Sequence, residues 1–292
     1  MKKTIVIILL SILGLVIVTN LVFVVRAIDY KSKAEKKSYL VEEEYSKVSI
    51  DSRVEDVNIY LSENSETKIV CVENKNVYFE IKVKDETLFI KKVDNRKFYD
   101  RIFDFGSYNL DVYLSKSVIE ELDINSNTAD ITIYSGFVFE KVKINNSTGD
   151  LEFSSKVTEV FDIETSTGEV DVEDCEYLGQ ASINTSTGDI DIRNTKCESL
   201  TIEVSTGEVD LEDVIVTKDL KIDGSTGDVS FDDIDAENIY IELSTGDVEG
   251  TILSSKFFDA DSDTGRVNVP KTREGGECII RVSTGDINIS YK

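Results

Sequence analysis

The chain has 292 residues and a formal net charge of −25, and it contains no His, no Trp and a single Pro. The absence of His excludes His-based catalytic triads, Cys-His pairs and His metal sites. The strong negative charge argues against nucleic acid as a partner, because phosphate groups repel an acidic surface. Composition therefore favours a binding or structural protein over an enzyme.

The first 26 residues predict a membrane anchor. Residues 4–25 carry no charge and stand between Lys2, Lys3 and Arg26. A helix of that length spans a hydrocarbon core of about 30 Å, whereas a cleaved signal peptide has a shorter apolar run of roughly 7–15 residues. We therefore predict an uncleaved transmembrane helix at 1–26 in a single-pass protein of the cell membrane. Its N-terminus is expected in the cytoplasm and its C-terminal body outside the cytoplasm.

Residues 27–46 follow the predicted helix as a charged juxtamembrane spacer. Their basic side chains can lie against anionic headgroups or be solvated, and both interpretations stay open. The same basic side chains count against a cytoplasmic N-terminus, while the two lysines that precede the helix favour it. The basic residues of the spacer and its border are Arg26, Lys31, Lys33, Lys36 and Lys37.

A repeat built on Ser-Thr-Gly-Asp or Ser-Thr-Gly-Glu occupies residues 122–292. Apolar, mostly β-branched residues alternate at period two on both sides of each Gly, which predicts strands with one buried face. A period near 20 residues is typical of solenoids, so each coil is expected to contain a strand, the Ser-Thr-Gly-Asp turn, a second strand and a looser return. The Gly residues recur every 19 or 20 positions, at Gly149, Gly168, Gly188, Gly207, Gly227, Gly246, Gly265 and Gly285.

The same pattern extends upstream in a degraded form. Ala129 and Glu55 stand in the position of the repeated Gly, which indicates a different turn there if the regular Gly has positive φ. Residues 47–121 predict longer strands and hairpin-like loops. The fold class predicted for the whole chain is all-β: a parallel β-solenoid of about 20-residue coils. It has an irregular β-rich N-terminal half and is preceded by one transmembrane helix.

The four cysteines, Cys71, Cys175, Cys197 and Cys278, lack CxxC spacing, which excludes zinc ribbons and thioredoxin-type sites. Cys278 falls on a core-facing position and is expected to be a buried apolar residue. A disulfide between Cys175 and Cys197, in adjacent coils, remains one open pairing.

The last coil in chain order ends at Tyr291-Lys292 without a capping helix. We therefore expect it to form the free end of the solenoid, where unpaired strand edges invite association. Arg266, Pro270, Lys271 and Arg273 are interpreted as residues that protect this edge.

Three passages carry a family resemblance: "VSIDSRVEDVNIYLS", "YNLDVYLSKSVIEELDINSNTADITI" and the run of "NSTGD/TSTGE" coils. Over about residues 47–292 the chain resembles bacterial surface β-strand-repeat proteins labelled "putative adhesin", otherwise a domain of unknown function. Some of these relatives belong to Lia-type envelope stress responses and have a single membrane anchor. The resemblance implies a surface protein and transfers no catalytic residue, because the family has none established.

The repeated turn has a structural and a metal-binding interpretation. As a corner, its Gly adopts the required conformation and its Ser, Thr and Asp side chains bond nearby backbone groups. A phosphate loop is excluded, because eight acidic copies between strands would repel phosphate. Calcium is the one cofactor left open, since bound Ca²⁺ would relieve repulsion within a column of acids one coil apart. That column contains Asp150, Glu169, Asp189, Glu208, Asp228, Asp247 and Asp286.

The aromatic cluster "FYDRIFDF" is most simply interpreted as core and loop packing, and it is also a candidate partner-binding patch through Phe98, Tyr99, Phe103 and Phe105. The predicted function is a non-enzymatic, membrane-anchored binding or scaffold module at the bacterial cell envelope, with a role in envelope stress. Its partner is expected to be an envelope component or a membrane protein. One alternative is an adhesin for foreign surfaces. A polysaccharide-acting enzyme is another, and it would need a pair of acids outside the repeat pattern.

Overall fold

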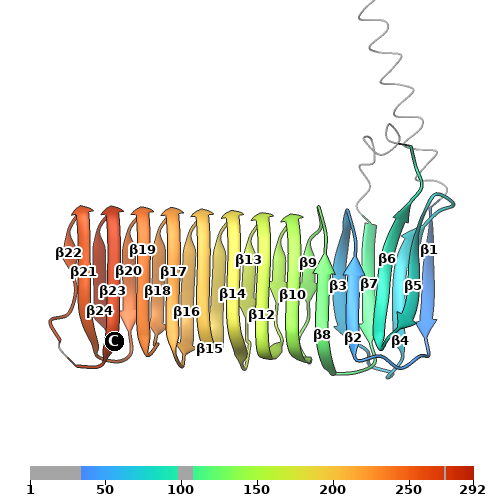
Figure 1. Cartoon of the computed structure of the whole chain (residues 1–292), viewed down its shortest axis with the longest axis horizontal. Helices are drawn as coiled ribbons and strands as arrows, with labels where there is room; N and C mark the ends of the chain where they lie inside the picture. Colours follow the sequence, from blue (N-terminus) through green and yellow to red (C-terminus); the bar gives the residue numbers. More distant parts are fainter. Residues whose placement is uncertain (1–33, 98–107, 273) are drawn as a thin grey trace, which may run out of the picture.

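The computed structural model describes residues 34–97, 108–272 and 274–292. Within these ranges the chain forms 24 strands, which stack as coils into one elongated rack (Figure 1). The all-β solenoid predicted from the repeat is therefore confirmed. The anchor predicted at 1–26 and the aromatic cluster at 98–105 lie outside the described residues. Within the described part of the chain, no helix is long and apolar enough to cross a membrane.

The strands that precede each corner form one side of the rack, which we call face A. Neighbouring strands in its regular part run parallel and in register, so that the same position of each coil lies beside its copy in the next. In spatial order, face A contains β5 (Val77–Lys84), β6 (Thr87–Asp94), β2 (Lys47–Asp51), β8 (Val118–Asn125), β10 (Val138–Thr148), β12 (Lys156–Thr167), β14 (Leu178–Thr187), β15 (Ile190–Thr206), β17 (Asp219–Thr226), β19 (Asn238–Thr245), β23 (Gly276–Thr284) and β21 (Lys256–Thr264).

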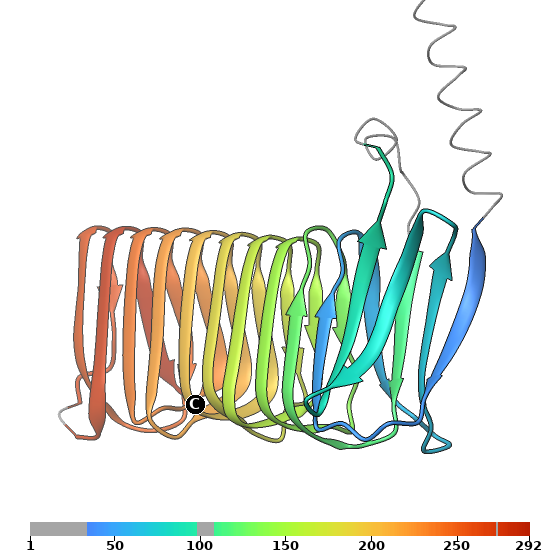
Figure 2. The same cartoon turned by 45° about the vertical axis from the view of Figure 1, so that its right-hand side comes forward.

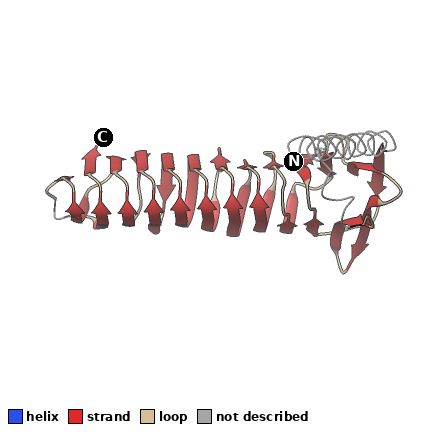
Figure 3. Cartoon of the chain, turned by 90° about the horizontal axis from the view of Figure 1, so that it is seen from above, coloured by secondary structure: helices blue, strands red, loops and turns tan. Residues whose placement is uncertain are grey.

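The strands that follow each corner form the opposite side, face B, and the two faces appear as two rows when the rack is viewed from above (Figure 3). Strand β15 is long enough to run from face B into face A. In spatial order, the other strands of face B are β1 (Glu35–Val41), β4 (Thr67–Glu73), β7 (Tyr108–Leu114), β3 (Glu55–Leu61), β9 (Ile131–Ile133), β11 (Leu151–Phe153), β13 (Val170–Glu173), β16 (Val209–Val216), β18 (Val229–Ile234), β20 (Val248–Ile252), β24 (Ile287–Tyr291) and β22 (Val267–Asn268).

A thin aliphatic core fills the space between the faces. The alternating positions predicted to point inward are buried; Ile163, Val170 and Cys278, for example, are 0% exposed. Phe137, Phe139, Phe153 and Phe161 widen this core beside β10 and β12, where their rings pack against one another at tilted angles. Burial and aliphatic packing of this kind supply the main favourable term in folding.

The described cysteines are buried free thiols. The open pairing of Cys175 with Cys197 is therefore not formed. Burial raises the pKa of both thiols to about 12, so they stay protonated at neutral pH and behave as small apolar residues.

Glycine is needed at the corner because the coils approach each other closely there. Gly168 has φ +137°, and a Cβ on it would overlap the carbonyl oxygen of Gly149 and lie 2.6 Å from its carbonyl carbon. An L-residue would therefore suffer both backbone strain and a backbone clash at this position. Ala129 occupies the first coil of the series, where no Gly corner precedes it.

A second regular corner lies six residues after the Gly. Asp174, Asn194, Asp213 and Asp233 occupy it in successive coils and have φ between 45° and 56°. Asn and Asp tolerate this left-handed conformation better than other residues with a side chain. The return segment, which was expected to be loose, is thus as regular in these coils as the first corner.

The expected coil order at the C-terminal end is wrong. Strand β23 lies between β19 and β21, and β24 lies between β20 and β22. The coil at 256–268, not the last coil in the chain, therefore forms the free end (Figure 2). The hydroxyl of Tyr291 accepts a hydrogen bond from the N–H of Lys256 at 3.0 Å, which ties the chain terminus to that outer coil. Arg266 lies on the outer coil and pairs with Asp286, whereas Arg273 lies outside the described residues.

The irregular end shows a similar change of order. Strands β2 and β3 lie between β6 and β7 on one side and β8 and β9 on the other. Strand β1 falls within the range 27–46 that was predicted to be a spacer, and it pairs antiparallel with β4. Part of that range is thus integrated into the rack.

Buried ionic groups replace the Gly corner at the irregular end. Glu55, in the Gly position, is 2% exposed and forms an ion pair with buried Lys92, while the Ser52 hydroxyl donates to its carboxylate at 3.0 Å. Two strands away, Glu73 accepts hydrogen bonds from the Phe79 N–H and the Tyr39 hydroxyl, each at 2.7 Å. Burial opposes the charged form of Glu73, but these donors together with Lys37 outweigh burial and hold its pKa below the usual range.

Candidate functional site

The acids of the repeat form a column along the corner and bond to the backbone of the neighbouring coil. Asp150 Oδ1 accepts the N–H of Glu169 at 2.9 Å, and Asp228 Oδ1 accepts the N–H of Asp247 at 2.8 Å. Glu169 and Glu208 make no such bond to the coil beyond them, although both coils are described. The extra methylene of Glu moves its carboxylate away from the position that the Asp carboxylate occupies. The Asp of Ser-Thr-Gly-Asp is therefore a cap between coils.

This corner acid column is the predicted calcium site, and the structure places its members one coil apart as expected. In the described residues, no three Asp, Glu, Cys or His side chains converge closely enough to hold a metal ion. Asp286 pairs with Arg266, whose N–H and guanidinium lower the pKa of Asp286. Burial and the nearby Asp191 carboxylate raise the pKa of Glu169. Calcium binding at the column stays a prediction.

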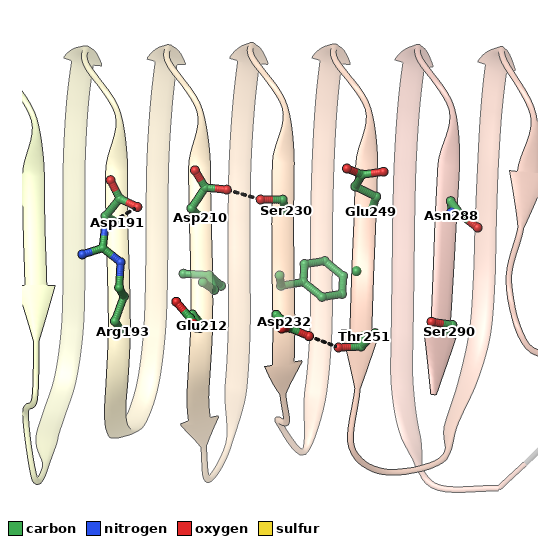
Figure 4. A pocket seen from close by; sticks show the side chains of 13 residues that line it. Asp191, Arg193, Asp210, Glu212, Ser230, Asp232, Glu249, Thr251, Asn288 and Ser290 are labelled. Carbon is green, nitrogen blue, oxygen red and sulfur yellow. Dashed lines mark hydrogen bonds and ion pairs between the residues drawn. The ribbon is translucent and has the colours of Figure 1, made fainter. Parts of the chain in front are cut away.

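A shallow groove of about 640 Å³ crosses face B over five strands, β15, β16, β18, β20 and β24 (Figure 4). Its polar side chains stand three or five residues after the repeated Gly, positions that point outward in every coil. Ser230 and Ser290 place short side chains at two of these outward positions, and Gly250, on the inward row beside Phe231, carries no side chain. The lining consists of Asp191, Arg193, Asp210, Leu211, Glu212, Ser230, Phe231, Asp232, Glu249, Gly250, Thr251, Asn288 and Ser290.

The single cation of the groove is already neutralised. Arg193 lies 3.1 Å from Asp191 and 3.5 Å from Asp171, and it also pairs with Glu173. Its three carboxylate neighbours raise its pKa further, against the opposing effect of burial. The cationic charge is thus unavailable to an anionic ligand.

The carboxylates on the other side of the groove differ in how they are bonded. Asp232 accepts the Thr251 hydroxyl at 2.7 Å, and Asp210 accepts the Ser230 hydroxyl. Glu212 and Glu249, on β16 and β20, have no hydrogen-bond or ion-pair partner in the described part of the chain. Two free carboxylates therefore face the groove.

A row of stacked tyrosines continues face B toward the irregular end. The ring centroids of Tyr113 and Tyr60 are 4.9 Å apart, and those of Tyr60 and Tyr134 are 4.5 Å apart. The Lys68 ammonium lies 5.4 Å from the Tyr113 ring centre, a cation–π contact. The sequence contained a signal for two members of this row, because Tyr60 and Tyr134 stand five residues after Glu55 and Ala129, the residues in the Gly position. Tyr113 joins them through the strand register, which places it beside Tyr60.

A model of the Toastrack DUF4097 family matches residues 45–223 and 211–292. The chain belongs to this family. Among solved structures, a "putative lipid binding protein" from Parabacteroides distasonis is 16% identical, with a TM-score of 0.55. A "putative adhesin" from the same species is 14% identical, with a TM-score of 0.50. Each match covers 88% of this toastrack chain and 97% of the other chain, and at these identities it shows the fold alone. No curated protein matches the chain.

The arrangement on face B of this toastrack chain suits recognition of a cationic group. Every acid of the groove occupies a position of the repeat, so none of them lies outside the pattern as the enzyme alternative requires. An open, shallow groove also differs from the concave, largely apolar pockets that enclose small substrates. Free carboxylates on β16 and β20, two coils apart, can accept hydrogen bonds from ammonium or guanidinium groups.

Proposed function

We propose that this toastrack protein is a non-enzymatic binding or scaffold module of the bacterial cell envelope, anchored by its N-terminal segment. Its face B groove holds an amine-bearing, extended envelope component. The observation that carries this proposal is the pair of free carboxylates, Glu212 and Glu249, in a groove that crosses five strands. The family membership and the acidic body support a surface role, and an envelope stress function is one setting for it.

The shape of the groove supports an extended ligand over a compact one. Neighbouring strands lie about 4.8 Å apart, so that a chain crossing them meets the same polar positions at a regular interval. A strongly negative surface attracts cationic partners over distances of about a Debye length, roughly 10 Å at 0.1 M salt. Binding through this groove is therefore expected to weaken as the salt concentration rises.

The experiment measures binding of the purified full-length chain, kept in detergent, to isolated envelopes from its own cells lacking the protein and to foreign cells. Glu212→Gln combined with Glu249→Gln is expected to weaken envelope binding roughly tenfold, which corresponds to about 1.4 kcal/mol from two lost charge-assisted contacts. The matched control replaces two exposed face A acids, Glu140→Gln and Glu242→Gln, with the same change of net charge.

Equal binding by the double variant and by the wild-type chain would show that the groove is not the site. A clear preference for foreign cells over the protein's own envelopes would favour the adhesin alternative. Loss of binding in the control variant as well would indicate a diffuse charge effect without a defined site.

A further inference from the structure

The rack leaves its core incompletely covered at its two ends. Strands β5 and β21 are the first and last strands of face A and lie at opposite ends of the molecule (Figure 1). Among the described strands, β5 pairs only with β6 and β21 only with β23, so each keeps one unpaired edge. Their inward side chains pack against the core but are only partly buried; these are Ile81 and Val83 on β5 and Phe258 and Ala260 on β21. Each end therefore offers unpaired backbone groups and apolar surface that a further strand would cover.

The edge strand of the free end, β21, is acidic on its outward row. Asp259, Asp261 and Asp263 alternate along this row with the inward side chains. Asp259 pairs with Arg281, whereas Asp261 and Asp263 have no hydrogen-bond or ion-pair partner in the described part of the chain. Phe257, at the start of the same row, is 47% exposed. The free end therefore presents two uncompensated carboxylates beside apolar surface.

The residues expected to protect the free end do not block the edge of β21. Pro270 and Lys271 follow β22, which belongs to face B. Arg266 stands in the acid position of the corner, where its N–H and its guanidinium bind Asp286 of the inner coil at 2.8 and 2.7 Å. The outer coil thus has no carboxylate at its corner to cap the N–H of a further regular coil. A strand that comes without the Ser-Thr-Gly-Asp corner suits this edge better.

Strand β5 is such a strand, and it carries the opposite charge at one end. Lys82 and Lys84 are exposed on its outward row, which also contains Tyr78 and Glu80. Lys84 has one carboxylate neighbour, Asp85, at 3.7 Å, and Lys82 has no hydrogen-bond or ion-pair partner in the described residues. Strand β5 runs antiparallel to β6, which runs parallel to β2 and to the regular strands of face A. The β5 strand of one copy can therefore pair antiparallel with the β21 strand of another.

We propose that two copies of this chain join end to end, with β21 of one copy paired to β5 of the next. Opposite side chains of an antiparallel pair lie about 4.5–5.5 Å apart, and opposite charges there are stabilising. One register sets the two free carboxylates, Asp261 and Asp263, opposite Lys84 and Lys82. Pairing of two β21 strands is a poorer match, because their acidic rows would face each other.

The proposed contact is heterologous and does not close on itself. Each copy has one β21 edge and one β5 edge, so a joined pair still has one of each to offer. Contacts of this kind produce open chains of subunits when no rotation closes them into a ring. The assembly is therefore expected to lengthen as the protein concentration rises, and it does not depend on the ligand of the face B groove.

The test is sedimentation velocity of the full-length chain in detergent over a series of concentrations. The wild-type chain is expected to form species whose masses rise by one chain at a time. One variant carries Asp261→Lys with Asp263→Lys, and a second carries Lys82→Glu with Lys84→Glu. Each variant alone should need an at least about tenfold higher concentration to associate, because like charges then face each other. An equimolar mixture should associate as the wild-type chain does, because the lysines of one variant meet the glutamates of the other.

The matched control is Glu140→Lys with Glu242→Lys, which changes two exposed acids of face A away from both ends and alters the net charge as the first variant does. It should associate as the wild-type chain does, and circular dichroism checks that every variant keeps its β-structure. A wild-type chain that stays single at every concentration would overturn the proposal, and so would folded variants whose mixture does not recover. Assembly that stops at two chains and is lost only in the first variant would show pairing of two free ends instead.

Discussion

The regular coils and the irregular end bury the same kind of aliphatic core, yet they satisfy their polar groups in opposite ways. In the regular coils, a polar group is matched by its copy in the next coil, as Asp228 is by the backbone of Asp247. At the irregular end, polar groups are satisfied by single contacts that are not repeated, such as the ion pair of Glu55 with Lys92. The difference shows that stacking can be specified by a short repeated pattern, whereas closing one end of the stack needs residues chosen for one place only.

The largest effect is expected at the buried ion pair of the irregular end. Lys92→Met leaves the Glu55 charge uncompensated in the core, and removal of one partner of a buried pair costs about 3–5 kcal/mol. Urea unfolding, with hydrogen exchange on β3 and β6, measures the loss. Adding Glu55→Gln to Lys92→Met removes the uncompensated charge and should recover most of the lost stability. If Lys92→Met alone is as stable as the wild-type chain, the irregular end does not depend on this buried ion pair and the proposed difference between the two regions is wrong.

A smaller but still large effect is expected where two corners touch. Gly207→Ala places a Cβ 2.6 Å from the carbonyl carbon of Gly188 at φ +151°, and strain with overpacking should cost about 3 kcal/mol. Gly224→Ala is the matched control, because its Cβ meets only a movable methyl group of Leu243, at 2.5 Å. Urea midpoints compare the two. If both variants lose the same stability, the close approach of the two backbones does not explain why Gly occupies the corner.

The smallest effect concerns the alternation of Asp and Glu in the corner acid column. Asp228→Ala removes a carboxylate that caps the N–H of Asp247, and should cost about 1 kcal/mol. Glu208→Ala removes a carboxylate with no such bond and should leave stability nearly unchanged. Hydrogen exchange should accelerate at the amide of Asp247 in the first variant and stay unchanged at the amide of Asp228, on the coil beyond Glu208, in the second. Equal acceleration in both would show that Asp and Glu act alike.

The solenoid could be predicted because its pattern is local. Period-two alternation around each Gly places residues such as Ile163 and Val170 inward regardless of what lies next to the coil. The order of coils at the C-terminal end could not be predicted in this way, because 256–268 and 276–291 carry the same pattern and fit the same neighbour. Only their side chains at the contact, including Tyr291, distinguish the two orders.

The candidate sites depended on contacts between coils, which one coil's sequence does not contain. The corner column was recognised because its acids repeat, but the difference in reach between Asp and Glu became visible only beside the next backbone N–H. The face B groove depends on short residues such as Ser230, which the register places between Asp210 and Glu249 of the two neighbouring strands.

The position of β23 and β24 inside the stack has a consequence for the order of folding. Strands β21 and β22 pair only with β23 and β24 among the described strands, and β23 and β24 in turn pair with β19 and β20. The outer coil at 256–268 is therefore expected to join the rack after residues 276–291, although it precedes them in the chain. Until then the edges of β19 and β20 are unpaired.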